Sequence, residues 1–269
     1  MKYGLIAIFL LLSLYSTIHA RPVVMMTGYW PPTSEMIYRF SDDPELNPDG
    51  WIGENWEGSG YNIHAYFPEF PGGTEANPKG DGDFEVDYQD TSADFWRITD
   101  EIEPIAIISF GLAEENNDWR VEGGNRKYSA SYWYQDYLYP QRPTSDLPIY
   151  HEPNGYRWSS LPMTDIVDAV NIAVPTLNAH QTNNDTSRFL CNFLGYHVNW
   201  YHDMHSAPSD EAWNIAAGFI HVGSNMTLAE GELATQTTLR TVIDYVNTVV
   251  PEPGAGLLFM LVLPVMRRR

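Results

Sequence analysis

Two unbroken apolar runs constrain the fold of this chain more than any other feature of its sequence. Residues 105–110 read Ile-Ala-Ile-Ile-Ser-Phe, and residues 218–222 read Gly-Phe-Ile-His-Val. Such runs are typical of strands buried on both faces, as in parallel sheets, whereas strands with one wet face alternate apolar and polar residues. Residues 22–30 predict a further buried strand that ends in a glycine turn. We therefore expect a parallel sheet at the centre of the molecule.

Segments with helical periodicity separate these runs. They fall at residues 92–102, with Thr91 or Ser92 as the expected cap, and at residues 165–173, 189–200 and 228–249. Weaker strand patterns fall at residues 62–70 and 173–179, and residues 123–156 predict a loop-dominated segment rich in aromatic residues and proline. Strands that alternate with helices predict a three-layer α/β/α sandwich with a mostly parallel central sheet.

The two ends of the chain differ in composition from the part between them. Residues 1–20 begin with a basic residue, continue with an apolar core and end in Ala20, which is the pattern of a signal peptide. Residues 21–249 hold the predicted strands and helices, a length that can bury the core of one α/β domain. Residues 250–269 contain Pro-Glu-Pro, an apolar stretch and three final arginines. We expect one domain between two terminal segments.

The C-terminal segment resembles the PEP-CTERM sorting signal of Gram-negative bacteria. The resemblance implies an exosortase-type processing enzyme as a partner. Together with the signal peptide, it implies an exported protein that is periplasmic, cell-surface or extracellular, with the tail as a membrane tether or transmembrane helix. The formal net charge of −20 argues against nucleic acid and anionic membrane surfaces as partners.

The only cysteine, Cys191, lies at the start of one of the expected helices. Residues 183–187 are of the types that cap helices, and Phe189, Phe193, Tyr196 and Trp200 then repeat at helical spacing. The first turn of a helix favours a thiolate because its N–H groups are free and the helix dipole is positive there. The alternative is that Cys191 is a small buried hydrophobic side chain.

A cysteine nucleophile needs a base within hydrogen-bond reach and a third group that orients the base. Groups of this kind gather at the carboxyl ends of strands in open parallel sheets. His221 ends one of the apolar runs, and Glu122 follows the other along the chain. A carboxylate there could hold the imidazole in its productive tautomer. Seven other histidines leave this choice open on sequence alone, and a histidine at a strand end often has only a structural hydrogen bond.

Several blocks of the sequence resemble one family of cysteine peptidases. Residues 185–192 end in Arg-Phe-Leu-Cys-Asn, residues 218–222 read Gly-Phe-Ile-His-Val, and residues 110–122 and 23–29 contain Phe-Gly-Leu-Ala, Arg-Val-Glu and Thr-Gly-Tyr. With the preceding segment 161–170, these blocks are similar to the pyroglutamyl-peptidase I (pyrrolidone-carboxylate peptidase) family, and their order agrees over about residues 23–248.

The resemblance implies a reaction and a set of residues for it. The reaction is hydrolysis of the amide bond that joins an N-terminal pyroglutamyl residue to the rest of a peptide, with neither a metal nor an organic cofactor. Family members often form homo-oligomers. The implied catalytic residues are Cys191 as nucleophile, His221 as general acid and base and Glu122 as its orienting partner, and the implied substrate-binding residues are Tyr29, Trp30 and Asn192.

The sequence departs from the family at the substrate pocket. Residues 29–34 read Tyr-Trp-Pro-Pro-Thr-Ser, where the family has Phe-Glu-Pro-Phe-Gly-Gly. Residues 186–187 are Thr-Ser instead of Ala-Gly, Gly223 replaces a proline, and Gly123 and Gly124 replace the usual arginine-containing strand after Glu122. An alternative function is therefore a catalytically altered, surface-displayed binding protein on the same fold.

Two further interpretations rest on residue types alone. A metal site could form from His197, His202 and His205, although histidines on an aromatic helix are more often structural. The aromatic residues 132–139 could bind a glycan, although such residues also pack against one another. We also expect the loops of residues 133–158 to shield Cys191 from oxidation as a lid.

Overall fold

The computed structural model describes residues 21–250, except residues 154, 184 and 186. Its main sheet has the strand order β2-β1-β3-β8-β4-β7. The six strands are β1 (Val23–Thr27), β2 (Asn62–Tyr66), β3 (Ala106–Leu112), β4 (Asp118–Glu122), β7 (Asn178–Thr182) and β8 (Ala216–Val222). A small second sheet pairs β5 (Gly124–Arg126) with β6 (Tyr156–Trp158). The predicted terminal segments 1–20 and 250–269 lie outside the described residues, apart from Val250.

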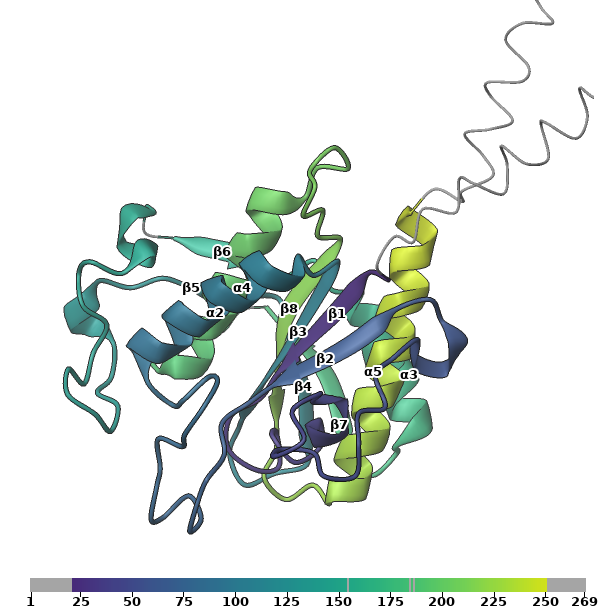
Figure 1. Cartoon of the computed structure of the whole chain (residues 1–269), viewed down its shortest axis with the longest axis horizontal. Coiled ribbons are helices and arrows are strands. Elements are labelled where there is room, and N and C mark those ends of the chain that lie inside the picture. The colour runs from purple at the N-terminus through teal and green to yellow at the C-terminus, as the bar shows by residue number, and fades with distance from the viewer. Residues whose placement is uncertain (1–20, 154, 184, 186, 251–269) are drawn as a thin grey trace, which may run out of the picture.

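Helices cover both faces of the main sheet (Figure 1). They are α2 (Tyr88–Ile102), α3 (Met163–Ala173), α4 (Leu190–His205) and α5 (Leu228–Val249). The helices α3 and α5 lie on one face, and α2 and α4 lie on the other (Figure 1). The predicted three-layer α/β/α sandwich is therefore confirmed. Short 3₁₀ turns occur at Tyr38–Phe40 (η1), Trp56–Gly58 (η2), Ala130–Tyr132 (η3) and Pro148–His151 (η4).

The sheet separates two hydrophobic cores. Alternate residues of a strand point to opposite faces, so Ile108 of β3 joins the core under α3 and α5, while Ile107 joins the core under α2 and α4. Both side chains are fully buried. This explains why the strand reads as a continuous apolar run.

The strand β4 was not predicted, and it runs against its neighbour. It pairs antiparallel with β8 and parallel with β7, whereas the other pairs of the main sheet are parallel. Its sequence, Asp-Trp-Arg-Val-Glu, buries Trp119 and Val121 on the side of α3 and α5. The polar residues Arg120 and Glu122 therefore face the side of α2 and α4. Because one face of β4 is polar, its sequence lacks the unbroken apolar run by which β3 and β8 were predicted.

Two element boundaries differ from the sequence prediction. The helix α2 begins at Tyr88, because the side chain of Asp87 accepts hydrogen bonds from the backbone N–H groups of Gln89 and Asp90. Thr91 and Ser92 lie inside the helix and are buried, so neither is the cap. The strand expected at residues 173–179 is also misplaced, since α3 continues to Ala173 and β7 begins at Asn178.

Candidate active site

Cys191 is the second residue of α4, as the sequence predicted. The predicted capping residues do not cap this helix: Phe189 is the N-cap, with an extended backbone and no side-chain hydrogen bond to the first turn. The N–H groups of the first turn therefore have no side-chain acceptor. They remain available to stabilise negative charge at the thiol or at a bound substrate.

Gly111 of β3 makes room for the thiol. A Cβ atom at this position would lie 2.7 Å from Cys191 Sγ and 2.6 Å from the ring of Phe219. Both distances are shorter than a normal van der Waals contact. Gly111 pairs with His221 in the register of β3 and β8, so the space that it leaves lies directly beside the imidazole. The missing side chain allows the start of α4 to approach the sheet.

The side chains of His221 and Glu122 meet at the edge between β8 and β4. His221 Nδ1 donates a hydrogen bond of 2.9 Å to Glu122 Oε1, and both side chains are buried. The antiparallel register pairs His221 with Arg120, so Glu122 is its diagonal neighbour on the same face. Thr182 of β7 donates a hydrogen bond to the other carboxylate oxygen, Glu122 Oε2. The carboxylate is thereby held in one orientation.

Cys191 also contacts His221 and influences its protonation. Burial acts to lower the pKa of His221, but the hydrogen bonds to Cys191 and Glu122 outweigh it and raise the pKa to about 10. Because Nδ1 faces Glu122, Nε2 is the ring nitrogen that remains for the thiol. The imidazole is therefore charged at neutral pH and can give a proton to a group bound in the cavity that His221 and Cys191 both line. The structure thus brings together Cys191, His221 and Glu122, which are separated in the sequence.

An apolar cavity of about 190 Å³ lies on one side of Cys191, and we call it the acyl pocket. Its lining residues are Tyr29, Trp30, Val86, Leu112, Ala113, Phe189, Leu190 and Cys191. Tyr29 is buried, and its hydroxyl shares a hydrogen bond of 2.9 Å with Thr91. Burial raises the pKa of Tyr29 well above its usual value, so the phenol stays neutral. No aspartate, glutamate, lysine, arginine or histidine lines this pocket.

Trp30 forms the outer wall of the acyl pocket. Its Nε1 donates a hydrogen bond of 2.8 Å to the carbonyl of Pro78, and its ring packs against Tyr137 with a centroid distance of 5.6 Å. Trp30 and Leu112 also line a neighbouring cavity of about 220 Å³. The tryptophan therefore separates the acyl pocket from this neighbouring cavity.

A second cavity, of about 320 Å³, adjoins the acyl pocket and shares Leu112, Ala113, Phe189 and Cys191 with it, and we call it the leaving-group cavity. Its other lining residues include His221, Arg120, Asp185 and Glu114. Cys191 therefore borders two cavities of different character, and His221 lines only the polar one. Roles for Arg120, Asp185 and Gly111 were not predicted from the sequence. Arg120 could have been found there, because it lies two residues before Glu122 and side chains two residues apart in a strand lie on the same face.

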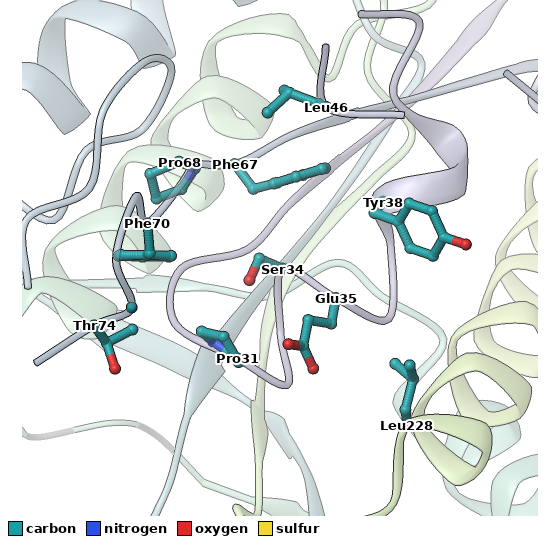
Figure 2. A pocket seen from close by; sticks show the side chains of 11 residues that line it. Pro31, Ser34, Glu35, Tyr38, Leu46, Phe67, Pro68, Phe70, Thr74 and Leu228 are labelled. Atoms are coloured by element: carbon teal, nitrogen blue, oxygen red, sulfur yellow. The ribbon is translucent and has the colours of Figure 1, made fainter. Parts of the chain in front are cut away.

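A larger hollow lies away from this chemistry. It has a volume of about 700 Å³ and is surrounded by Pro31, Ser34, Glu35, Tyr38, Leu46, Phe67, Pro68, Phe70, Gly73, Thr74 and Leu228 (Figure 2). It shares Pro31 and Thr74 with the cavity beyond Trp30. None of Cys191, His221 and Glu122 lines it. Size alone therefore does not identify the candidate active site.

Asn192 is not placed to bind a substrate in the acyl pocket. It is fully buried, and its Oδ1 accepts a hydrogen bond from the backbone N–H of Arg126. Its amide nitrogen donates to the carbonyls of Arg126 and Ser187. The side chain holds β5 against α4, and it lines neither cavity beside Cys191. The prediction of a substrate-binding role for Asn192 is corrected to a structural one.

The three histidines of the alternative metal site do not converge. His197 is fully buried, with Nδ1 donating to the carbonyl of Phe193 and Nε2 bonded to Ser92, and burial lowers its pKa to about 4. His202 forms a hydrogen bond with Asn214, and His205 forms one with Asp210. Within residues 21–250, the described side chains include no group of three or more potential metal ligands.

The aromatic segment 132–139 contributes both to the core and to the surface. Trp133 is buried and packs on Phe193 of α4 with a centroid distance of 5.4 Å. Tyr132 and Tyr134 each pack on the guanidinium of Arg188, at 4.5 and 4.1 Å from the ring centroids. Tyr137 reaches the wall formed by Trp30. This segment therefore supports the outer wall of the acyl pocket from behind.

Comparisons with known proteins support the fold. No protein-family model matches the chain, and no curated protein matches it in sequence. The structure is similar to pyrrolidone carboxyl peptidase from Thermococcus litoralis, with a TM-score of 0.58 and 15% identity, covering 86% of this chain and 97% of that one. It is also similar to the enzyme from Pyrococcus furiosus, with a TM-score of 0.56 and 14% identity, covering 83% and 99%.

At these identities the likeness establishes the fold, which is the α/β/α fold of pyrrolidone carboxyl peptidases. The resemblance inferred from the sequence is confirmed at this level. Among the described residues, no helix is long and apolar enough to cross a membrane.

Proposed function

We propose that this chain is a cysteine peptidase that removes an N-terminal pyroglutamyl residue from peptides. The observation that carries the proposal is the hydrogen bond from His221 to Glu122, with His221 and Cys191 lining one cavity at the start of α4. A nucleophile, a base and a group that orients the base are the parts that this chemistry requires. The fold similarity to pyrrolidone carboxyl peptidases supports the same reaction.

In the first step, the Cys191 thiolate attacks the carbonyl carbon of the pyroglutamyl residue. The free N–H groups at the start of α4, including that of Cys191, stabilise the oxyanion. The C–N bond then breaks, and the leaving nitrogen takes a proton from the His221 imidazolium. In the second step, neutral His221 removes a proton from water. The resulting hydroxide attacks the thioester and releases pyroglutamate and the thiolate.

The acyl pocket supports a pyroglutamyl residue better than an ordinary N-terminal residue. A pyroglutamyl ring is uncharged, whereas an ordinary N-terminus carries an ammonium group. Burying an ammonium group without a nearby carboxylate costs several kcal/mol, and no carboxylate lines the acyl pocket. Tyr29 and Trp30 present flat apolar surfaces on which a lactam ring can pack.

We further propose that the protein acts outside the cytoplasm and that an exosortase-type enzyme processes its C-terminal tail. The support for this part is the composition of residues 1–20 and 250–269. Formation of a homo-oligomer is a further part of the proposal and rests only on the family resemblance.

The test is hydrolysis of a pyroglutamyl-aminocoumarin substrate by the purified full-length chain, beside Cys191→Ala. We expect fluorescence release by the wild type and a loss of at least a thousand-fold in the variant. The rate of Cys191 labelling by iodoacetamide is measured in parallel at pH 7. No turnover with rapid labelling would mean an active thiol that acts on another acyl group. No turnover with an inert thiol would favour the surface-displayed binding protein.

A further inference from the structure

The position of His221 distinguishes the two sides of the candidate active site. Cys191 lines both cavities, but His221 lines only the leaving-group cavity. The leaving nitrogen must receive its proton from His221, so it must be on that side. The residue that follows the pyroglutamyl group in the substrate therefore enters the leaving-group cavity. The following argument rests on the proposed function.

Arg120 supplies positive charge in this cavity. It pairs with His221 in the antiparallel register, so the two side chains project from adjacent positions on one face of the sheet. Its Nη2 donates a hydrogen bond of 2.8 Å to Glu114 Oε2 and lies 3.8 Å from Asp118 Oδ2. Its Nε is buried and has no hydrogen-bond partner among the residues that the structure describes. A guanidinium has five N–H donors, so Arg120 has donors to spare for a ligand.

Asp185 supplies negative charge on the same cavity. It is only 8% exposed, and its carboxylate accepts hydrogen bonds of 2.6 and 3.0 Å from the backbone N–H and hydroxyl of Ser187. Its own backbone N–H bonds to the carbonyl of Gly124, which fixes its position. No arginine or lysine of the described segment forms a salt bridge with it. Burial raises its pKa, and the charge of nearby His221 acts in the opposite direction, as a bound cation would.

A free amino acid carries the complementary pair of charges on its main chain. We propose that the leaving-group cavity binds the departing residue as a free amino acid, with Arg120 on its carboxylate and Asp185 on its amino group. The preferred substrates are then pyroglutamyl dipeptides with a free C-terminal carboxylate, rather than amides or longer peptides. Arginine suits this role because its planar N–H groups match a carboxylate.

The experiment compares pyroglutamyl-alanine with pyroglutamyl-alaninamide, and release of pyroglutamate is measured by mass spectrometry. We expect the wild type to have a kcat/KM at least ten-fold higher for the free acid. The amide lacks the carboxylate and therefore loses the charge-assisted hydrogen bonds to Arg120. In Arg120→Gln this ratio falls to within about three-fold of unity, because only the free acid loses a partner. Arg39→Gln, which changes an exposed arginine of η1, is the matched control and keeps the wild-type ratio.

A ratio near one in the wild type would overturn the inference. So would an equal loss for both substrates in Arg120→Gln, since Arg120 would then be structural. If that variant does not fold, inhibition of the wild type provides the test. Alanine should inhibit at least ten-fold better than alaninamide or N-acetylalanine, each of which lacks one charge, and equal inhibition would refute the proposal. Absence of pyroglutamate release from both pyroglutamyl-alanine and the aminocoumarin substrate would instead overturn the proposed function itself.

Discussion

At the scale of single residues, the candidate active site depends on one absent side chain and one hydrogen bond. Gly111 leaves the space that Cys191 Sγ needs beside the sheet. His221 donates a hydrogen bond to the carboxylate of Glu122 and lines the same cavity as Cys191. Neither arrangement follows from residue type alone, because most glycines and histidines in proteins have other roles.

Gly111→Ala should impair catalysis more than it impairs folding. The added Cβ would lie 2.7 Å from Cys191 Sγ, so the thiol or the start of α4 must move. Misplacement of a nucleophile by about 1 Å can cost about a hundred-fold in rate, whereas overpacking typically costs about 1–3 kcal/mol of stability. The measurements are kcat with the aminocoumarin substrate and urea unfolding. An unchanged kcat would show that the thiol tolerates the methyl group.

The protonation of His221 should appear in the pH dependence of both activity and stability. Because its pKa is raised to about 10 in the folded protein, we expect kcat/KM to fall as the pH rises through about 10. In Glu122→Gln the hydrogen bond to a charged acceptor is lost, so this alkaline limb should move to lower pH. The rate at neutral pH should also fall by about a hundred-fold or more. A limb that did not move would mean that another group controls it.

The raised pKa of His221 also predicts how the stability of the protein changes with pH. The folded pKa of His221 lies above its usual value of 6.5. Its contribution to stability is therefore fully present below about pH 6.5 and is lost as the pH rises through about 10. Urea unfolding of the wild type should show this decline, and His221→Gln should show less of it.

At the scale of elements, the turn after β1 forms part of the acyl pocket, and we expect it to select the acyl group that binds. Trp30 stands between the acyl pocket and the adjoining cavity, and Pro78 and Tyr137 hold it there. The aromatic segment between β5 and β6 thus acts as a support for this wall. The expectation that this segment shields Cys191 from oxidation stays a prediction.

Trp30→Ala should join the acyl pocket of about 190 Å³ to the cavity of about 220 Å³. We expect the KM for the pyroglutamyl-aminocoumarin substrate to rise at least ten-fold, because the lactam ring of the substrate loses the indole of Trp30 as a packing surface. Hydrolysis of a larger acyl substrate, such as acetyl-leucyl-aminocoumarin, should become detectable. The matched control is Trp158→Ala, which removes a tryptophan that is 59% exposed. Equal effects of the two changes would contradict the role of Trp30 as a wall.

At the scale of the whole molecule, the charge of −20 opposes compaction. Like charges repel one another more strongly in the folded chain than in the expanded one, and salt screens this repulsion. We expect the Tm to rise between 10 mM and 500 mM sodium chloride, and equally in potassium chloride. A Tm that stayed constant or fell would mean that the surface ion pairs outweigh the net repulsion.

Local sequence patterns were sufficient for much of the architecture. The apolar runs of β3 and β8, the helix α5 and the start of α4 near Cys191 follow from hydrophobic periodicity, because the burial of each depends mainly on its own residues. The three-layer sandwich follows from their alternation. Cys191 and His221 could be selected because each stands at the start or end of such an element, and Glu122 because it follows the apolar run of β3 and because of the family resemblance.

Tertiary structure alone decided the rest, because distant segments had to be brought together. The strand β4 gains its place from pairing with β8 and β7, which turns Arg120 and Glu122 toward the thiol. Asn192 has a side chain suited to binding a ligand, yet β5 takes up its hydrogen bonds. The division of the candidate active site into an apolar and a charged cavity also depends on which residues pack across Cys191. A linear pattern holds no information about such partners until the chain has folded.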